Sequence, residues 1–405
     1  MAGRAVAETR PPFAWAKSFL SVGITGTNGK TSTTRLVAHV FYAAGLHVVA
    51  ETTLGFELDC LPLAANKTLK GFYDAMQRAA RIGARHAAIE VTSQSLGKGF
   101  AKSWRLDIGV FTNLTRDHMD THGTFEHYLA SKAQLFVHLP ARGAAVLNAA
   151  DPSSDLLARV TPPEVRRIWY AARSRGELVA RPDLMARAVE IDEHGTHVEL
   201  EPSPLAERLG GGFLIRLVGE VFAENALGAA CATLAAGIPG EAVKKGLLAC
   251  EAVAGRFQIV HSKPLVAVDY AHTPDALART CETARRLAKE GKTIVVFGAG
   301  GDRDQGKRGE MGKAVSERAD VAIVTSDNPR SEDPADIARA IVAGFGAGKN
   351  ARIELDRRRA IEMAIDLAAD GDVVLVAGKG HEEGQTIGDE TRPFSDIAVI
   401  REIVG

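Results

Sequence analysis

Residues 23–31 have the residue types and spacing that point most directly to a chemistry. They read GITGTNGKT and lie between an apolar run and a predicted helix. Glycines let backbone N–H groups close around a phosphate, and the N-terminus of the helix adds positive potential. Lys30 supplies a charge for the β- and γ-phosphates, and Thr31 offers a hydroxyl to Mg²⁺. The segment therefore predicts a phosphate-binding loop.

The loop departs slightly from the strict pattern G-x-x-x-x-G-K-[ST]. That pattern needs glycine at position 24, where the chain has Ile24, and the first glycine is Gly23. The plain structural alternative is a glycine-rich turn that happens to contain a lysine. Because strand, loop and helix follow in the required order, the phosphate-binding interpretation is favoured.

Two further polar groups follow predicted strands. Glu90 ends the run AAIEV, and residues 112–123 read TNLTRDHMDTHG, which includes Asp117, His118, Asp120 and His122. Since the carboxyl ends of parallel strands place ligand-binding groups, a carboxylate and a histidine there can hold a second Mg²⁺. The alternative is a polar loop with hydrogen-bonded histidines.

Apolar runs and helical patterns alternate along the first half of the chain. Short runs predict strands, and longer amphipathic stretches predict helices. The predicted strands are 21–25, 47–50, 87–91, 108–112 and 144–148, with helices at 30–44 and 72–82. This alternation predicts a mostly parallel sheet that is covered on both faces.

The second half repeats this pattern after an interruption. Residues 165–217 have shorter alternating runs that predict a hairpin or a small antiparallel sheet, and two alanine-rich helices are predicted at 222–236 and 240–250. From residue 264 the α/β pattern resumes. Strands are predicted at 265–269, 293–297, 321–325 and 372–377, and helices at 274–290, 309–318, 334–345 and 357–369. We therefore expect an α/β protein with a second, Rossmann-like domain.

Composition narrows the possible partners. The 405 residues include 49 Lys and Arg against 50 Asp and Glu, so the formal net charge is −1. This balance argues against nucleic acid or an anionic membrane as a partner, because both need concentrated positive charge. The four cysteines form no CxxC pair, and no apolar run approaches the roughly 18 residues of a membrane span. A cytoplasmic location is expected.

Seven motifs, in order, resemble those of the Mur ligases. They are TGTNGKT, TNLTRDHMDTHG, SKAQLF, VDYAHTPDAL, GAGGDRDQGKR, SDNPRSEDP and AGKGHEEGQ. The resemblance covers essentially the whole chain and is greatest to the UDP-N-acetylmuramoyl-tripeptide synthetases. It implies a central ATP-binding domain at residues 1–253 and a C-terminal, amino-acid-binding domain at residues 254–405.

The resemblance also implies an activity. Family members use ATP and Mg²⁺ to join an amine to a carboxylate through an acyl phosphate, releasing ADP. Such chemistry needs charge neutralisation and alignment. The implied catalytic residues are Lys30, Glu90, His118 and Lys132, and the implied metal-site residues are Thr31, Glu90, His118 and Lys132. Lys132 matches a lysine that family members carbamylate; its structural alternative is a surface helix lysine.

Two groups of binding residues are implied as well. The nucleotide would be bound by Gly26, Thr27, Asn28, Gly29, Lys30, Thr31, Ser32, Asn148, Asn225, Arg256, Asp269 and His272. The amino acid would be bound by Arg303, Asp327, Asn328, Arg330, Gly378 and Glu382. The DNPR motif matches family members that select meso-diaminopimelate, with Arg330 gripping the distal carboxylate and Glu382 the distal ammonium.

The acceptor site departs from the family pattern. The phosphate-binding loop lies within the first 31 residues, so we expect no N-terminal domain for a uridine diphosphate group. Acceptor-binding positions also differ from those of the family. Where family members have His, Gln, Arg and Asn, this chain has Gln94, Lys98, Phe100 and Phe222, respectively. The Thr-Thr-Gly that contacts the acceptor in the family is replaced near residues 65–67. We therefore expect a carboxylate acceptor without a UDP-sugar.

Three alternatives remain open. In the first, the chain is a cell-wall ligase whose UDP-binding domain is supplied by another chain. In the second, it is a ligase that adds glutamate to a folate-like acceptor. In the third, it is a nucleotide-binding regulator without ligase chemistry. The DNPR motif argues against the second. Retention of Lys30, Glu90, His118 and Lys132 argues against the third.

Overall fold

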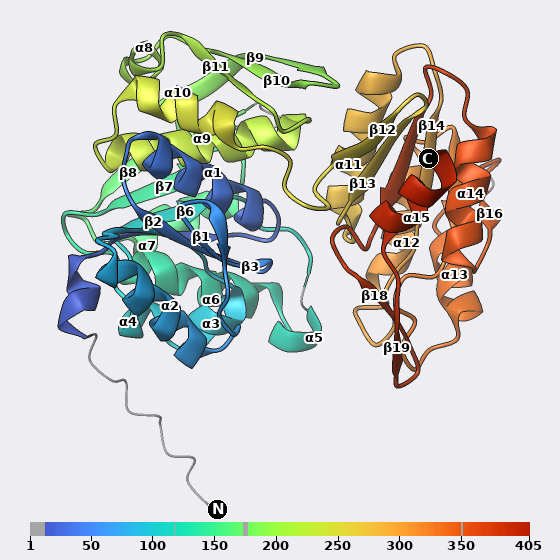
Figure 1. The fold of residues 1–405 in the computed structure, drawn as a ribbon, viewed down its shortest axis with the longest axis horizontal. Helices are drawn as coiled ribbons and strands as arrows, with labels where there is room; N and C mark the ends of the chain where they lie inside the picture. The colour runs from blue at the N-terminus through green and yellow to red at the C-terminus, as the bar shows by residue number, and fades with distance from the viewer. Residues whose placement is uncertain (1–12, 118, 173–176, 350) are drawn as a thin grey trace, which may run out of the picture.

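The chain folds into two α/β domains that lie side by side (Figure 1). The structure is a computed structural model and describes residues 13–117, 119–172, 177–349 and 351–405. The central domain comes first in the chain, and the C-terminal domain follows helix α10. A continuous apolar cluster extends from one domain into the other and includes Phe222, Val253 and Phe257. Because this cluster excludes water at the joint, the two domains form a packed interface.

The central domain is built on an 11-stranded sheet in the order β11-β10-β9-β8-β7-β6-β1-β5-β2-β3-β4. Its middle strands are parallel and apolar on both faces, as strands buried between two helical layers must be. The strands are β1 (Leu20–Thr25), β2 (Val48–Thr52), β3 (Gly55–Leu58), β4 (Leu61–Leu63), β5 (His86–Glu90), β6 (Ile108–Phe111), β7 (Ala144–Asn148), β8 (Arg166–Ala171), β9 (Leu184–Asp192), β10 (Gly195–Leu200) and β11 (Gly212–Ile215).

Helices cover both faces of this sheet. One face packs against α1 (Lys30–Ala43), α9 (Glu220–Ala235) and α10 (Gly240–Ala249). The other packs against η1 (Ala14–Ser18), α2 (Leu69–Arg81), α3 (Ser93–Gly97), α4 (Phe100–Ser103), α6 (Phe125–Val137) and α7 (Ser153–Val160). The short helices α5 (Met119–His122) and α8 (Pro204–Arg208) lie in connections. Threonine side chains cap α2, α3 and α6, which fixes where these helices begin.

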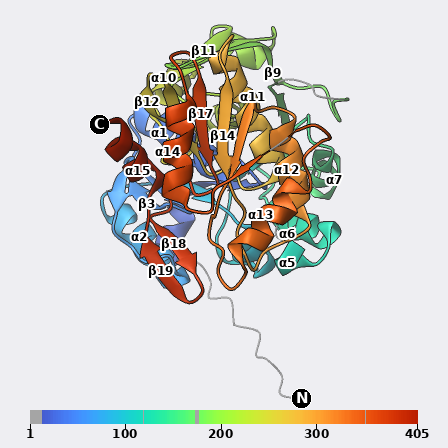
Figure 2. The same cartoon turned by 90° about the vertical axis from the view of Figure 1, so that its right-hand side faces the viewer.

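The C-terminal domain has a six-stranded sheet in the order β12-β13-β17-β14-β15-β16. Figure 2 shows this sheet between two helical layers. The strands are β12 (Gln258–Ser262), β13 (Leu265–Asp269), β14 (Thr293–Phe297), β15 (Val321–Val324), β16 (Arg352–Ile353) and β17 (Val373–Ala377), with a separate hairpin of β18 (Gly384–Ile387) and β19 (Glu390–Pro393). The helices are α11 (Pro274–Ala288), α12 (Lys307–Ser316) and α13 (Pro334–Val342) on one face, and α14 (Arg357–Leu367) and α15 (Asp396–Val404) on the other.

The sequence-based fold is confirmed with one refinement. Two sheets with helices on both faces were expected, and each predicted strand is present within a few residues. The antiparallel segment at 165–217 is not a separate sheet, because β8 pairs in parallel with β9 and joins it to the central sheet. Strands β3, β4, β12, β16, β18 and β19 were not predicted. Most are short or only partly buried, so their sequences have little hydrophobic periodicity. No helix among the described residues is long and apolar enough to cross a membrane.

We predict that Gly246→Ala destabilises the central domain. Gly246 lies where α10 crosses α1, and a Cβ atom there would clash with the backbone of Val40. Overpacking of this kind costs about 1–3 kcal/mol, which exceeds the roughly 1 kcal/mol that alanine gains in helix propensity. Thermal denaturation should show a lower midpoint for this variant. The exposed neighbour Lys245 provides the control, since Lys245→Ala should leave the midpoint nearly unchanged; equal midpoints for both variants would contradict the packing argument.

Candidate active site

The phosphate-binding loop connects β1 to α1 at the carboxyl edge of the central sheet. Gly26 has φ 153° and Gly29 has φ 84°, conformations that favour glycine. A Cβ atom at Gly26 would clash with the Thr112 hydroxyl, and one at Gly29 with the Asn225 side chain. Asn113 Oδ1 accepts a hydrogen bond from Asn28 N at 3.0 Å. Neighbouring segments therefore hold the loop in one conformation.

Lys30 is the first residue of α1 and points back over this loop. Its Nζ donates to Thr27 O at 2.7 Å. Burial lowers the pKa of the Lys30 ammonium below its ordinary value, and the Glu90 carboxylate opposes part of that shift. A cation held at a helix N-terminus with little surrounding water is suited to binding phosphate oxygens.

Oxygen atoms converge beside Lys30 at the ends of β2 and β5. Thr31 Oγ1 donates to Glu90 Oε2 at 2.8 Å, and Thr53 N donates to the same oxygen at 3.0 Å. Carboxylate and hydroxyl oxygens are the ligands that Mg²⁺ prefers, with further positions filled by water and phosphate. The Thr31–Glu90 pair thus fits a Mg²⁺ ion on a bound nucleotide. Thr53 was not identified from the sequence, although its place directly after β2 was a signal.

Lys132, on α6, lies on the other side of the loop and is only 1% exposed. Its Nζ donates to Gly26 O at 2.6 Å and lies 4.3 Å from the centre of the Tyr128 ring. Burial and then the charge of Lys30 lower the pKa of Lys132 well below its usual range. The alternative of a surface lysine is therefore wrong, and the implied catalytic and metal-site role of Lys132 stays a prediction.

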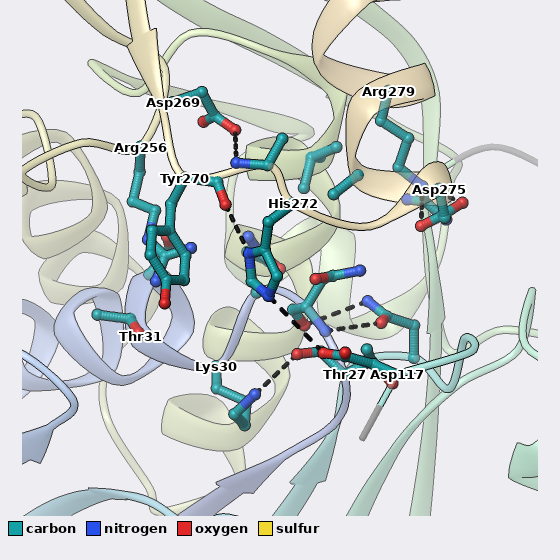
Figure 3. Close-up of a pocket in the computed structure, with 18 of the residues that line it drawn as sticks. Thr27, Lys30, Thr31, Asp117, Arg256, Asp269, Tyr270, His272, Asp275 and Arg279 are labelled. Carbon is teal, nitrogen blue, oxygen red and sulfur yellow. Dashed lines mark hydrogen bonds and ion pairs between the residues drawn. The ribbon is translucent and has the colours of Figure 1, made fainter. Parts of the chain in front are cut away.

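The C-terminal domain supplies the opposite wall of the site (Figure 3). Arg256 stacks on the Tyr270 ring, with its guanidinium carbon 4.5 Å from the ring centre. Asp269 accepts hydrogen bonds from Phe257 N at 2.6 Å and Ala271 N at 2.8 Å. Burial raises the pKa of Asp269 above its ordinary value, and the nearby Arg256 charge opposes the shift. Together with the loop these residues line a cavity of about 410 Å³ between the domains.

Charged groups link the domains around this cavity. Asp117 Oδ2 lies 3.8 Å from His272 Nε2, and Asp117 Oδ1 lies 3.7 Å from Lys307 Nζ. Arg116 Nε donates to Asp304 Oδ2 at 3.1 Å. All three partners belong to the C-terminal domain, so residues 116 and 117 hold the two domains together at the edge of the site.

A second interdomain contact lies beside Asn148. The Asn148 amide donates to Thr112 O at 2.7 Å and contacts the Glu224 carboxylate. Glu224 in turn accepts from Arg279 Nη1 at 2.7 Å. A smaller cavity next to the first is lined by Asn148, Glu224 and Arg279. Asn225, one residue further along α9, faces the phosphate-binding loop and is buried.

The residues predicted to bind an amino acid gather at the ends of β15 and β17. Arg330 has φ 51°, a strained conformation that clusters at functional sites, and its Nη1 donates to Gly301 O at 2.5 Å. Asn328 Nδ2 donates to Glu382 Oε2 at 2.9 Å. Gly378 has φ 114°, and a Cβ atom there would contact the Asp327 carboxylate. The tertiary fold therefore brings together three segments far apart in the sequence.

Most of the predicted residues thus meet at one cleft. Those lining the larger cavity are Thr27, Asn28, Gly29, Lys30, Thr31, Ser32, Glu90, Lys132, Asn225, Arg256, Asp269 and His272. Asn148 lines the smaller cavity instead. Arg303 is exposed and lies near Gly300. His118 lies outside the described residues. Within those described, no cluster of three or more His, Cys, Asp and Glu side chains could hold a metal ion, so a metal here would share its ligands with a nucleotide.

Comparison with known proteins agrees with this geometry. Residues 24–233 match the Mur ligase middle domain, and residues 255–380 match the Mur ligase, glutamate ligase domain. A UDP-N-acetylmuramoyl-L-alanyl-D-glutamate–2,6-diaminopimelate ligase of Aquifex aeolicus (strain VF5) is 38% identical over 396 residues, 95% of this chain and 77% of the relative. The corresponding ligase of Halalkalibacterium halodurans is 39% identical over 395 residues, 95% of this chain and 78% of the relative.

Solved structures show the same fold. One of a UDP-N-acetylmuramoyl-L-alanyl-D-glutamate–2,6-diaminopimelate ligase superposes with a TM-score of 0.64 at 30% identity, covering 98% of this chain and 79% of that one. A Mycobacterium tuberculosis folylpolyglutamate synthase superposes with a TM-score of 0.70 at 21% identity, covering 90% of this chain and 89% of that one. The second likeness concerns the fold alone.

We predict that Glu90→Gln weakens Mg²⁺-dependent nucleotide binding by roughly tenfold or more, since it removes the charge of a predicted metal ligand. It also removes the carboxylate that raises the pKa of Lys30. Calorimetric titration of ATP with and without Mg²⁺ measures the effect. The control is Glu126→Gln, on the exposed face of α6, which should bind like the wild type. An unchanged Mg²⁺ dependence in Glu90→Gln would contradict the assignment.

Proposed function

Because this chain belongs to the Mur ligase family, we propose that it joins a diamino acid such as meso-diaminopimelate to a carboxylate acceptor through an acyl phosphate. Members of the family are ATP-dependent acid–amino-acid ligases, and so is this chain. The observation that carries the proposal is the cleft: the phosphate-binding loop of one domain faces Arg256, Asp269 and His272 of the other across one cavity, which is also lined by His381, the neighbour of Glu382. We place the domain boundary between residues 253 and 254.

The acceptor carboxylate attacks the γ-phosphorus of ATP, breaking the bond to the β-phosphate oxygen and releasing ADP. The amine of the amino acid then attacks the acyl carbon, and phosphate leaves. Lys30 holds the γ-phosphate and neutralises charge as it moves. Thr31 and Glu90 would hold Mg²⁺, with Lys132 and His118 as the further metal-site residues that the family resemblance implies, and the ion would supply further charge neutralisation. Burial of the cleft between the domains excludes water, which would otherwise hydrolyse the acyl phosphate.

Residues from both domains hold the nucleotide in this proposal. Gly26, Thr27, Asn28, Gly29, Thr31 and Ser32 surround the phosphates. Asn148 and Asn225 contact the adenine, while Arg256 and His272 close over the nucleotide and Asp269 lies near the ribose. The ion pairs of Asp117 with His272 and Lys307 support this closed arrangement.

The charges of the C-terminal site suit a diamino dicarboxylic acid. Arg330 and Arg303 offer cations for a distal carboxylate, and Arg330 can bind it with two parallel hydrogen bonds. Glu382, with Asp327 and Asn328 beside it, offers an acceptor for a distal ammonium. The relatives at 38% and 39% identity carry 2,6-diaminopimelate in their names, which supports the same choice.

Substitutions in the central domain favour an acceptor without a UDP-sugar. Phe100, at the position of a family arginine, packs edge-on against Phe72 with ring centres 5.4 Å apart. Phe222 is buried at the position of a family asparagine, and Gln94, at that of a family histidine, lines the cavity. An aromatic ring cannot bind a diphosphate as a guanidinium does. The alternative is a UDP-N-acetylmuramoyl-dipeptide acceptor, which the names of the relatives favour.

The decisive experiment measures phosphate release from ATP with pairs of substrates. We expect release that requires meso-diaminopimelate, is not supported by glutamate, and proceeds with L-alanyl-D-glutamate at least as well as with its UDP-N-acetylmuramoyl form. Much faster turnover with the UDP-linked acceptor would make the chain a cell-wall ligase. Glutamate dependence would favour a folylpolyglutamate-synthase-like activity, and no amino-acid dependence would favour a regulator.

We also propose that Lys132 is carbamylated. Burial lowers the pKa of Lys132 well below its usual range, which favours the neutral amine that can add CO₂ and release a proton. Carbamylation would replace a cation near Lys30 with an anion and would still leave one N–H for Gly26 O, to which Nζ now donates at 2.6 Å.

We predict that Lys132→Ala lowers turnover by at least about tenfold, since the group is placed to support charge at the phosphates. Millimolar acetate or propionate should restore part of the rate by placing a carboxylate in the vacated space. Methylammonium is the matched control, because it restores the cation instead. Rescue by methylammonium and not by acetate would show that the uncarbamylated lysine is the working form.

A further inference from the structure

Lys379 is a fully buried lysine that borders the proposed amino-acid site. It follows Gly378 directly after β17, and its side chain is 0% exposed. Its Nζ donates to Asn328 Oδ1 at 3.0 Å and to Glu382 Oε2 at 3.1 Å. A buried ammonium is costly unless it is paired and hydrogen-bonded. These two hydrogen-bonding partners of Lys379 are residues of the proposed amino-acid site, so its place in the fold is tied to that site.

Lys379 is one of three groups that orient the Asn328 amide. Asn328 Oδ1 accepts from Lys379 Nζ and also from Thr386 N at 3.0 Å. Its Nδ2 donates to Glu382 Oε2 at 2.9 Å. A flipped amide would turn its NH₂ group toward two donors and its oxygen toward a carboxylate, which leaves no favourable hydrogen bond. The Asn328 side chain therefore has one satisfied orientation.

The same network aims the Glu382 carboxylate. Oε2 accepts from both Asn328 Nδ2 and Lys379 Nζ, whereas Oε1 has no hydrogen-bonding partner among the described residues. The Glu382 side chain is 32% exposed. One oxygen is thus anchored inside the protein, and the other is available to a ligand that can donate hydrogen bonds.

The loops that carry this network are fixed at their bases by a separate buried ion pair. Arg357 Nη1 donates to Ser326 O at 3.3 Å, after β15, and Nη2 donates to Ala377 O at 3.0 Å, at the end of β17. Arg357 is in turn held by both oxygens of Asp396 at 2.7 Å. Because the bases are held independently, Lys379 acts at the tips of the loops, where Asn328 and Glu382 lie.

We propose that Lys379 is a positioning residue that makes the site select amino acids with a distal ammonium group. It anchors Glu382 Oε2 and orients Asn328, so that Oε1 is presented as the acceptor for that ammonium. This inference rests on the proposed function, since it names the residue behind one part of the amino-acid selectivity.

The test compares binding of meso-diaminopimelate with binding of 2-aminopimelate, which lacks one amino group. Calorimetry uses the full chain saturated with Mg²⁺ and ADP. We expect the wild type to prefer meso-diaminopimelate by about 10- to 100-fold, as for a charge-assisted hydrogen bond. Lys379→Met should lose most of this preference while its affinity for ADP changes less than about twofold. Lys313→Met, an exposed lysine on α12, is the matched control and should keep the preference.

A double-mutant cycle shows whether Lys379 acts through Glu382. If it does, Lys379→Met adds little to the loss already caused by Glu382→Gln, because coupled residues are not additive. Should circular dichroism show that Lys379→Met is poorly folded, Lys379→Gln, which keeps an amide donor, takes its place and should also reduce the preference.

The outcomes separate the two proposals. A wild type that prefers meso-diaminopimelate alongside a folded Lys379 variant with the same preference would overturn the role of Lys379 alone. A wild type without any preference would overturn both that role and the proposed amino-acid substrate. Additive losses in the double-mutant cycle would also overturn the proposed role of Lys379, since Lys379 would then act independently of Glu382.

Discussion

The site depends on charges that are held close together with little water at the carboxyl edge of the central sheet. Lys30 and Lys132 lie on opposite sides of one loop, with Glu90 and Asp117 near enough to affect the pKa of both lysines. Isolated charges would not be stable there, because burial favours their neutral forms. The lysines and carboxylates therefore stabilise one another, and an anionic nucleotide with its metal ion would complete the compensation of charge. Because this compensation requires the charged groups to stay close together, the surrounding backbone is closely fixed.

The division into two domains also serves to hold charged groups close together with little water. The central domain holds the phosphate-binding loop, and the C-terminal domain contributes Arg256, Asp269 and His272 to the opposite wall. Contacts between the domains are charged at the rim, as with Arg116 and Asp304, and apolar beneath it. Such an interface lets substrates enter when it opens and excludes water when it closes. The proposed amino-acid site has its own support in the Arg357–Asp396 pair and the Lys379 network.

Much of the fold could be predicted because local patterns are strong where strands are fully buried. The runs at β1, β5, β14 and β17 are apolar on both faces, which fits only strands between two helical layers. The short strands β3 and β4 at one end of the large sheet and the hairpin of β18 and β19 could not be predicted, since few of their side chains are buried and they follow no clear period. The pairing of strands could not be predicted either. Strand β9 belongs to the large sheet because it pairs with β8, and such pairing depends on contacts between distant residues.

The sequence by itself determined that the chain is an ATP-dependent ligase, because the phosphate-binding loop is a local pattern and the ordered motifs resemble those of the Mur ligases. The tertiary structure decided which side chains act together. Lys379 looks like an ordinary surface lysine in its motif, yet it is buried against Asn328, which lies 51 residues earlier. Thr53 joins Glu90 for a similar reason, since parallel strands bring their ends to one edge. Burial and long-range pairing arise only when the chain has folded, and they convert separate motifs into a site.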